Sequence, residues 1–227
     1  MAIQATVINP VILNQQKIPL YVHSIPDRYL LVPVCPTAGM AFKWLRDQFC
    51  QNEIDLAIKN KEDAYDLMTR LADTVPAGSD GLVMLPHLSG AFSPRINPAA
   101  RGSFTGFTLS HTRAHFIRAV MEGVAFLLKQ NIDSIATAGI TPREIISSGG
   151  GSRSVLWNQI KADVCGLPLV TLKNEETALT GDAILSGVAS GIFPSIEQGC
   201  RQMVEIHERA YPGRDQASYQ KAYVHYL

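Results

Sequence analysis

The sequence predicts a single α/β domain over residues 1–227, on three observations. The first 35 residues are extended in character, three helical patterns lie between residues 37 and 138, and strands then alternate with helices up to about residue 190. Strands that are separated by helices are typical of parallel sheets whose faces are covered. No linker rich in Pro, Gly or Ser divides the chain.

The N-terminal part predicts a small meander of strands. Its three runs rich in Val, Ile, Leu and Tyr are Ile3–Asn9, Pro19–Ser24 and Tyr29–Cys35. Runs of this composition between turn residues favour strands. Because Pro33 has no backbone N–H, we expect the third strand to lie at an edge or to end there.

Two amphipathic helices are predicted next, over Thr37–Phe49 and Lys61–Thr74, where apolar residues recur every three or four positions. A short apolar run, Leu82–Leu85, precedes residues 86–102, which hold several prolines and glycines. This stretch is expected to be a long loop, and long loops in compact domains are often functional.

The longest predicted helix starts at Ser110 as its cap and runs to about residue 138. Ala119 and Gly123 would let a neighbour approach closely, so we expect this helix to be central and buried. The elements predicted after it are strand Glu144–Ser147, helix Ser154–Cys165, strand Pro168–Leu172 and helix Thr177–Ser190. Ser195 and Gln198 form a capping box that starts a further helix.

Composition limits the function classes. The 20 basic and 20 acidic side chains cancel, which argues against nucleic acid or an anionic membrane as a partner. No apolar run approaches the roughly 20 residues that cross a bilayer, and no signal peptide is recognisable, so a cytoplasmic protein is expected. The four cysteines are widely spaced without a CxxC pair, which gives no support to a zinc site or a disulfide framework.

The most informative segment runs from Ile145 to Asn158, where a buried strand passes through three glycines into a helix. Gly149, Gly150 and Gly151 carry no Cβ, so a ligand can press against the backbone. The free N–H groups at the start of the following helix suit phosphate oxygens, and a nucleotide is the natural occupant. A triglycine between strand and helix is also typical of a tight turn that binds nothing.

A second turn of small residues, PTAGMA at 36–41, leads into the helix that carries Lys43. It repeats the same geometry, so the two turns could face one ligand. The alternative is that Gly39 only eases helix packing.

The pair of histidines and the scattered acidic residues are interpreted as structural. His111 and His115 stand four residues apart, as in helical metal sites, but no glutamate lies between them and no third ligand is evident. The acidic residues are scattered, and no pair has the spacing of a two-metal or acid/base site.

Several segments together resemble the C-terminal domain of the FGGY carbohydrate kinases. LPHLSG at 85–90 and NPAARG at 97–102 are similar to the family's LPxLxG and DPxARG segments. GSFTGFT at 102–108, followed by residues 115–122, resembles the signature ahead of and along its long helix. The triglycine segment resembles its adenosine motif, and residues 176–183 the start of its next helix. The segments keep the family's order from about Pro19 to the helix at Ser195.

The resemblance implies an actin-like ATPase domain of the ribonuclease-H-like type, with a mixed sheet and helices on both faces. It also implies a sugar kinase that uses ATP and magnesium, with adenosine against the glycine turn and the sugar in a cleft facing a partner domain. The overall look of the motifs favours a pentulose such as xylulose. Ala91-Phe92 departs from the Glu-Arg that xylulokinases often carry there, and Asp182 stands where a small residue is usual.

Carried over residue by residue, the resemblance implies a set of nucleotide-binding positions. Ser154 falls where glycerol kinases place an asparagine beside the base. The full set is Gly39, Lys43, Gly149, Gly150, Gly151, Ser154 and Asn158.

The same resemblance implies an N-terminal sugar-binding domain that is absent from this chain. The DxGT phosphate motif, the catalytic aspartate and a second phosphate motif are not found in it. We therefore expect no catalytic residue here, magnesium held mainly through the missing half, and an inactive fragment, while a homodimer is left open.

Two other functions are alternatives. One is a stand-alone nucleotide-binding or regulatory domain, which an upstream coding sequence without a DxGT motif would favour. The other is a ribonuclease-H-type nuclease, which ranks last because that chemistry needs several carboxylates at strand ends to hold two metals.

Overall fold

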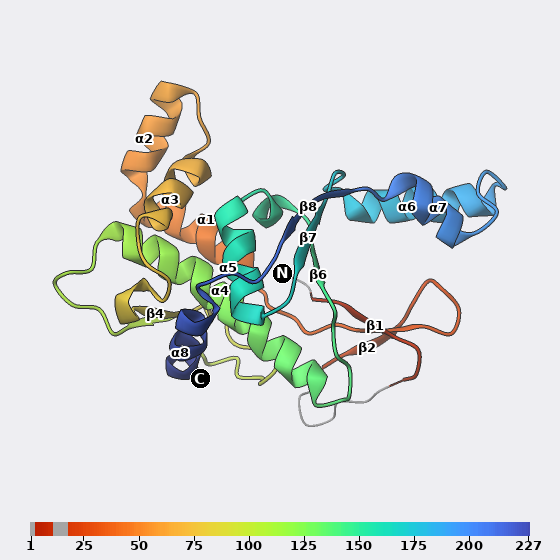
Figure 1. The fold of residues 1–227 in the computed structure, drawn as a ribbon, viewed down its shortest axis with the longest axis horizontal. Helices are drawn as coiled ribbons and strands as arrows, with labels where there is room; N and C mark the ends of the chain where they lie inside the picture. Colours follow the sequence, from red (N-terminus) through yellow and green to blue (C-terminus); the bar gives the residue numbers. More distant parts are fainter. Residues whose placement is uncertain (1–2, 11–17) are drawn as a thin grey trace.

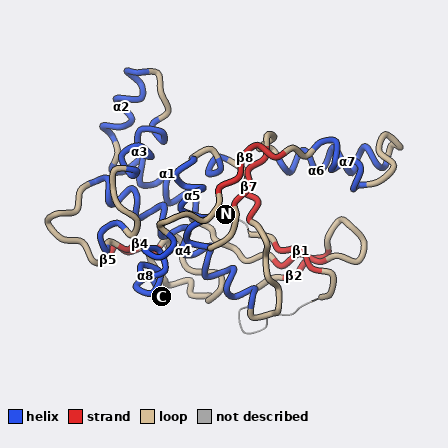
Figure 2. The backbone as a smooth tube through the Cα atoms, in the orientation of Figure 1, coloured by secondary structure: helices blue, strands red, loops and turns tan. Residues whose placement is uncertain are grey.

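The computed structural model describes residues 3–10 and 18–227. Within them the α/β class is confirmed, as the ribbon and the tube coloured by element show (Figures 1 and 2). The helices are α1 (Ala38–Phe49), α2 (Gln51–Asn60), α3 (Ala64–Asp73), α4 (Arg113–Ala136), α5 (Val155–Cys165), α6 (Thr177–Ala189), α7 (Ile196–Met203) and α8 (Gln216–Tyr226). The strands are β1 (Ala5–Val7), β2 (Leu20–Val22), β3 (Tyr29–Leu31), β4 (Val83–Leu85), β5 (Ser103–Thr105), β6 (Ile145–Ser147), β7 (Leu169–Leu172) and β8 (Ile206–Ala210).

α4 is the central helix that the sequence predicts. Every residue from Ile117 to Leu128 is buried, and α1, α3, α5, α8 and β4 pack against it. The helix begins at Arg113 rather than just after Ser110, because Thr112 is its N-cap and His115 Nδ1 accepts from the Thr112 N–H at 3.1 Å. α4 is strongly apolar, but neither it nor any other helix in the described part of the chain is long and apolar enough to cross a membrane.

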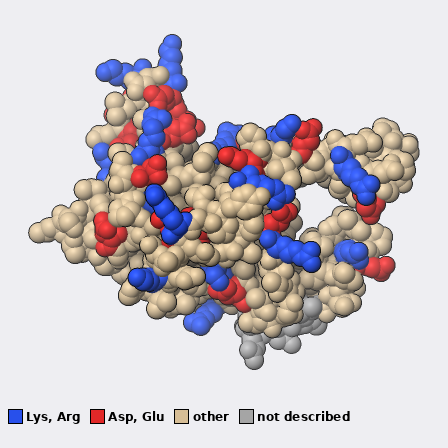
Figure 3. Space-filling view, in the orientation of Figure 1, with Lys and Arg blue, Asp and Glu red and all other residues tan. Residues whose placement is uncertain are grey.

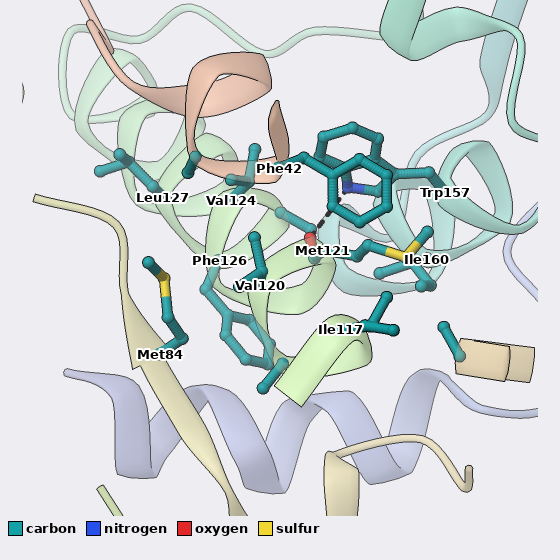
Figure 4. Packing of buried hydrophobic residues seen from close by; sticks show 14 of the residues in the cluster. Phe42, Met84, Ile117, Val120, Met121, Val124, Phe126, Leu127, Trp157 and Ile160 are labelled. Atoms are coloured by element: carbon teal, nitrogen blue, oxygen red, sulfur yellow. Dashed lines mark hydrogen bonds between the residues drawn. The ribbon is translucent and has the colours of Figure 1, made fainter. Parts of the chain in front are cut away.

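Trp157 joins α5 to α4 and α1 in the main core. Its indole N–H donates to the Met121 carbonyl oxygen at 2.9 Å, and its ring lies 5.1 Å from that of Phe42 (Figure 4). Gly123 lies where α4 crosses β4, and a Cβ there would overlap the Met84 carbonyl oxygen. The close approach predicted for Gly123 is therefore confirmed.

A buried polar network centres on Arg118 and Glu122 of α4. Arg118 donates from Nε to Glu122 at 2.9 Å and from one terminal nitrogen to the Tyr219 hydroxyl at 2.7 Å. Glu122 also accepts from the Ser79 hydroxyl at 2.8 Å and the Gly78 N–H at 3.0 Å. Burial raises the pKa of Glu122, and these donors oppose that effect. The network ties α8 to α4.

The strands form three small sheets. β1, β3 and β2 form an antiparallel sheet in the order β1-β3-β2. The predicted meander is therefore wrong, because β3 rather than β2 pairs with both other strands. β3 ends at Leu31, before Pro33. β4 pairs with β5, and β6 pairs in parallel with β7, as the alternation of strands and helices predicts. β8 adds antiparallel to β7, which makes this last sheet mixed; its sequence was not predicted to be a strand.

α6 and α7 form an arm that extends away from the body of the molecule (Figure 1). Ser195 caps α7 as predicted, accepting from the Gln198 N–H at 3.3 Å. Phe193 packs into the space left by two glycines, since a Cβ on Gly187 or Gly199 would lie 2.5 Å or 3.1 Å from its ring. The space-filling view shows an opening between this arm and the sheet of β1 and β2, with basic and acidic side chains interspersed over the visible face (Figure 3).

Candidate functional site

The glycine turn between β6 and α5 has a backbone that only glycine adopts readily. Gly149 has φ 76° and ψ −178°, a region essentially restricted to glycine. Ser152 closes the turn, donating from its hydroxyl to the Gly149 carbonyl oxygen at 2.7 Å. Ser154 then caps α5 by accepting from the Trp157 N–H at 3.2 Å. The turn is thus held in one conformation by its own serines.

The outer surface of this turn is unobstructed. A Cβ built on Gly149 or Gly150 would meet no atom within 4 Å, and one on Gly151 would touch only the Trp157 ring, at 3.6 Å. The glycines are therefore not required by packing, which leaves backbone conformation or a ligand as the reason for them.

The structure brings the two predicted turns together. Gly39 and Gly151 line one cavity of about 590 Å³, which we call the glycine-turn cavity. Ser147 and Ser148 line it beside them, and Gly39 lies in the first turn of α1. α1 therefore starts at the cavity, and the free N–H groups of its first turn favour an anionic ligand. The volume is within the range of small-molecule sites.

Lys161 is a cavity-lining residue that sequence reasoning missed. Its side chain is only 7% exposed, and its Nζ lies 3.2 Å from the Ser147 hydroxyl, 3.4 Å from the Gly151 carbonyl oxygen and 5.6 Å from the Trp157 ring centre. Burial lowers the pKa of Lys161 to about 8. A signal was available: the lysine falls one turn after Trp157, between Ile160 and Ala162, on a helix otherwise buried on that side.

Five of the seven predicted residues do not line the cavity, namely Gly149 and Gly150 of the glycine turn together with Lys43, Ser154 and Asn158. Lys43 is half exposed and forms an ion pair with Asp47 on the surface of α1. The Ser154 hydroxyl is engaged in its capping bond, as described above. Asn158 is buried, and its side-chain amide donates to the Ser152 carbonyl oxygen at 2.6 Å, so it stabilises the glycine turn.

The pair of His111, just before α4, and His115, in its first turn, does not line this cavity. The rings of His111 and His115 are 5.1 Å apart, and His115 Nε2 lies 3.2 Å from an Asp80 carboxylate oxygen. Among residues 3–10 and 18–227, no group of three His, Cys, Asp or Glu side chains is placed to hold a metal ion.

Comparison with protein-family models assigns residues 9–190 to the C-terminal domain of the FGGY family of carbohydrate kinases. The chain belongs to this family. The resemblance seen in the sequence is confirmed, and with it the actin-like ATPase fold of the FGGY kinases.

Individual FGGY kinases resemble the chain over most of its length. A xylulose kinase of Staphylococcus epidermidis is 33% identical over 196 residues, 86% of this chain and 38% of that protein. A gluconokinase of Bacillus subtilis is 34% identical over 187 residues, 81% of this chain and 36% of that protein. The structure of a xylulose kinase from Lactobacillus acidophilus superposes with a TM-score of 0.86 and 28% identity, over 99% of this chain and 44% of that one. The chain thus spans about two fifths of the length of these relatives.

Proposed function

We propose that this chain is the ATP-binding half of an FGGY sugar kinase that transfers the γ-phosphate of ATP to a hydroxyl of a small sugar. The observation that carries the proposal is the meeting of the two predicted small-residue turns, at Gly39 and Gly151, on one cavity. In this arrangement adenosine lies against the glycine turn, and the phosphates extend toward the first turn of α1.

The remaining parts of the reaction are assigned to a separate N-terminal half. Phosphoryl transfer needs a base for the sugar hydroxyl, a magnesium ion and donors around the γ-phosphate. The described residues offer no three-carboxylate or histidine cluster that fits magnesium, so no step is assigned to a metal held here. We infer that this chain alone, without the other half, has no sugar kinase activity.

Exposed apolar side chains support a partner half. Phe107 and Leu109 precede α4, and Leu179 and Ile192 lie on the arm; all four are at least 60% exposed. We infer that the partner half covers these two places, since an interface between domains buries apolar side chains that are exposed in one domain alone. The acceptor is a sugar or sugar acid of the kind named for the relatives, with xylulose favoured by the similarity to xylulose kinases.

The test is ATP binding by the 227-residue chain and by Gly150→Val. A Cβ there meets no protein atom within 4 Å, so the folded state should survive while the side chain occupies the ligand's space. We expect calorimetric titration to show at least tenfold weaker ATP binding and an almost unchanged melting temperature. Equal affinity in both proteins would remove the glycine turn from the nucleotide site.

A second candidate, a nucleotide-binding domain that never acts with a catalytic half, makes a different prediction. In that case ATP binding would persist, but supplying the N-terminal half of a related FGGY kinase would never produce sugar phosphorylation. Measuring ADP release with a panel of ketoses, polyols and sugar acids, with and without that half, distinguishes the two.

A further inference from the structure

A small cavity lies between α5 and the paired strands β7 and β8, and it shares no lining residue with the glycine-turn cavity. Its volume is about 80 Å³. Three residues of one face of α5 and five residues of the two strands line it: Val155, Asn158, Gln159, Leu169, Thr171, Glu208, Arg209 and Ala210. Because α5 packs on both strands, this cavity is formed entirely by elements that follow the glycine turn.

The pairing of β7 with β8 is irregular beside this cavity. Thr171 pairs with Glu208, whereas the next residue of β7, Leu172, pairs with Ile206. β8 therefore has one residue more than β7 at this point, as in a β-bulge. Leu169 and Thr171 share one face of β7, because successive side chains of a strand alternate, and both line the cavity. The cavity thus lies where the regular ladder of this sheet is interrupted.

Two buried oxygen atoms of the lining residues have no partner within residues 3–10 and 18–227. They are Asn158 Oδ1 and Thr171 Oγ, and the two residues are only 5% and 6% exposed. A buried polar atom without a hydrogen bond destabilises the folded state, so such atoms are nearly always paired with protein or with ordered water. Both of these atoms belong to residues that line the same small cavity.

The two atoms are complementary as donor and acceptor. The orientation of the Asn158 amide is set by Ser152, because its Nδ2 donates to the Ser152 carbonyl oxygen at 2.6 Å and leaves Oδ1 as an acceptor. The Thr171 hydroxyl can donate, but the two groups form no direct hydrogen bond. A water between them donates to Asn158 and accepts from Thr171. The cavity has room for it, since a water takes roughly 30 Å³ in the liquid.

We propose that this cavity binds an ordered water that bridges Thr171 and Asn158, and that Thr171 is thereby a positioning residue for the nucleotide site. The water holds the Asn158 amide, which holds the Ser152 carbonyl oxygen. The Ser152 hydroxyl in turn donates to the Gly149 carbonyl oxygen at 2.7 Å. A continuous chain of hydrogen bonds then joins β7 to the glycine turn. The effect on ATP rests on the proposed function, since that proposal places adenosine against this turn.

The experiment compares Thr171→Val, which keeps the shape of the side chain and removes its hydroxyl, with Thr171→Ser, which keeps the hydroxyl. Thr171→Val should weaken ATP binding about two- to tenfold in calorimetric titration, the range that one lost hydrogen bond corresponds to. It should also lower the melting temperature by about 1–4 °C. Thr171→Ser should restore the ATP affinity. Valine that leaves both quantities unchanged, or serine that binds ATP no better than valine, would overturn the proposal.

Ser134→Ala is the matched control. Its hydroxyl is also buried without a partner in the described part of the chain, but Ser134 lies on α4 and lines neither this cavity nor the glycine-turn cavity. Removing an unpartnered hydroxyl should not lower the melting temperature or the ATP affinity.

A double variant tests the route through Asn158. In an Asn158→Ala background the water has lost its acceptor, so Thr171→Val should have no additional effect on ATP affinity. Independent, additive effects of the two changes would contradict the bridge.

Two readouts without ATP separate this inference from the proposed function. A high-resolution crystal structure should show a water within hydrogen-bonding distance of both Asn158 Oδ1 and Thr171 Oγ. The Ser152 amide donates to the Gly149 carbonyl oxygen at 2.9 Å, and its hydrogen exchange should be about two- to tenfold faster in Thr171→Val, while exchange at Gln198 in α7 stays the same.

A bridging water together with faster exchange at Ser152, in a chain that does not bind ATP, would support the bridge and contradict the proposed function. ATP binding by a protein whose crystal structure has no water at this position would contradict the bridge alone.

Discussion

Arg118 and Lys161 are both buried basic side chains, 4% and 7% exposed, yet their surroundings differ completely. Arg118 donates to Glu122, to the Ala72 carbonyl oxygen at 3.1 Å and to the Tyr219 hydroxyl, and its pKa is raised above the ordinary value. Lys161 has one hydroxyl and one carbonyl oxygen at longer range, and its pKa falls to about 8. Although the two side chains are similarly buried, Arg118 therefore has a structural role and Lys161 faces the cavity.

The difference shows how burial should be interpreted in this fold. A buried charge with a full set of partners holds helices together, and removing it leaves the partners unsatisfied. A buried charge with few partners destabilises the protein and is retained where a ligand supplies the missing interactions. The following experiments test this contrast, in order of expected effect.

Arg118→Met should cause the largest loss of stability. It leaves the Glu122 carboxylate buried at 1% exposure without its counter-charge, and breaking such a pair costs about 3–5 kcal/mol. Urea unfolding measures the change. Arg70→Met, which removes an exposed ion pair with Glu62, is the control and should cost about 1 kcal/mol or less. A similar cost for the two variants would mean that the network does not hold α8 to α4.

Lys161→Met should stabilise the protein at neutral pH and weaken ATP binding. The pKa of Lys161 is about 8 in the folded protein, against an ordinary value of 10.5 that applies to the unfolded chain. Between pH 8 and 10.5 the unfolded chain therefore binds more protons than the folded protein. The free energy of unfolding of the wild type consequently rises as the pH rises through this range. The gain relative to the variant is at most about 3 kcal/mol.

Urea unfolding of the wild type and Lys161→Met at pH 7, 8, 9 and 10 measures this difference. Lys221→Met, an exposed change of the same charge on α8, is the control and should give a pH-independent difference. A stability difference for Lys161→Met that does not vary with pH would show that the lysine is not held in an unfavourable site.

Gly149→Ala should lower stability by about 1–3 kcal/mol through backbone strain alone, because φ 76° with ψ −178° excludes a Cβ. Gly191→Ala in the arm is matched in φ, at 77°, and a Cβ added there would also meet no atom within 4 Å. Both changes should lower the melting temperature, but only Gly149→Ala should also weaken ATP binding. Equal ATP affinity in the two variants would count against the site.

Lys43→Ala should have the smallest effect on stability, within about 0.5 kcal/mol, because its ion pair with Asp47 is on the surface. The family resemblance predicts that ATP binding nevertheless weakens several-fold. Unchanged affinity by calorimetry would remove Lys43 from the nucleotide site and leave the cavity residues as its basis.

The sequence predicts those features that depend on local chemistry. The parallel pair β6–β7 and the cap at Ser195 follow from composition and turn residues within a few positions of each site. The meeting of Gly39 and Gly151 was predicted as one of two alternatives, because each small-residue turn leads from a strand into a helix.

Features that depend on distant contacts were missed. β8 has mostly exposed side chains and is defined only by its pairing with β7, so its sequence lacks a strong strand pattern. α2 buries only Glu53 and Ala57, which gives it no clear apolar face. Lys161 is a surface residue type, so its position one turn after Trp157 was not interpreted as buried, and its Nζ contacts Ser147 and Gly151, which are distant in sequence.

The bond between Arg118 and Tyr219 also sets an order of events during synthesis on the ribosome. The two residues are 101 positions apart, so at about 5–20 residues per second the arginine exists for roughly 5–20 s before its tyrosine partner is made. During that interval α4 has its acidic neighbour but lacks α8, and the apolar face that Tyr219 and Tyr226 later cover is available to chaperones. Native packing of the central helix therefore follows the synthesis of Tyr219, 101 positions after Arg118.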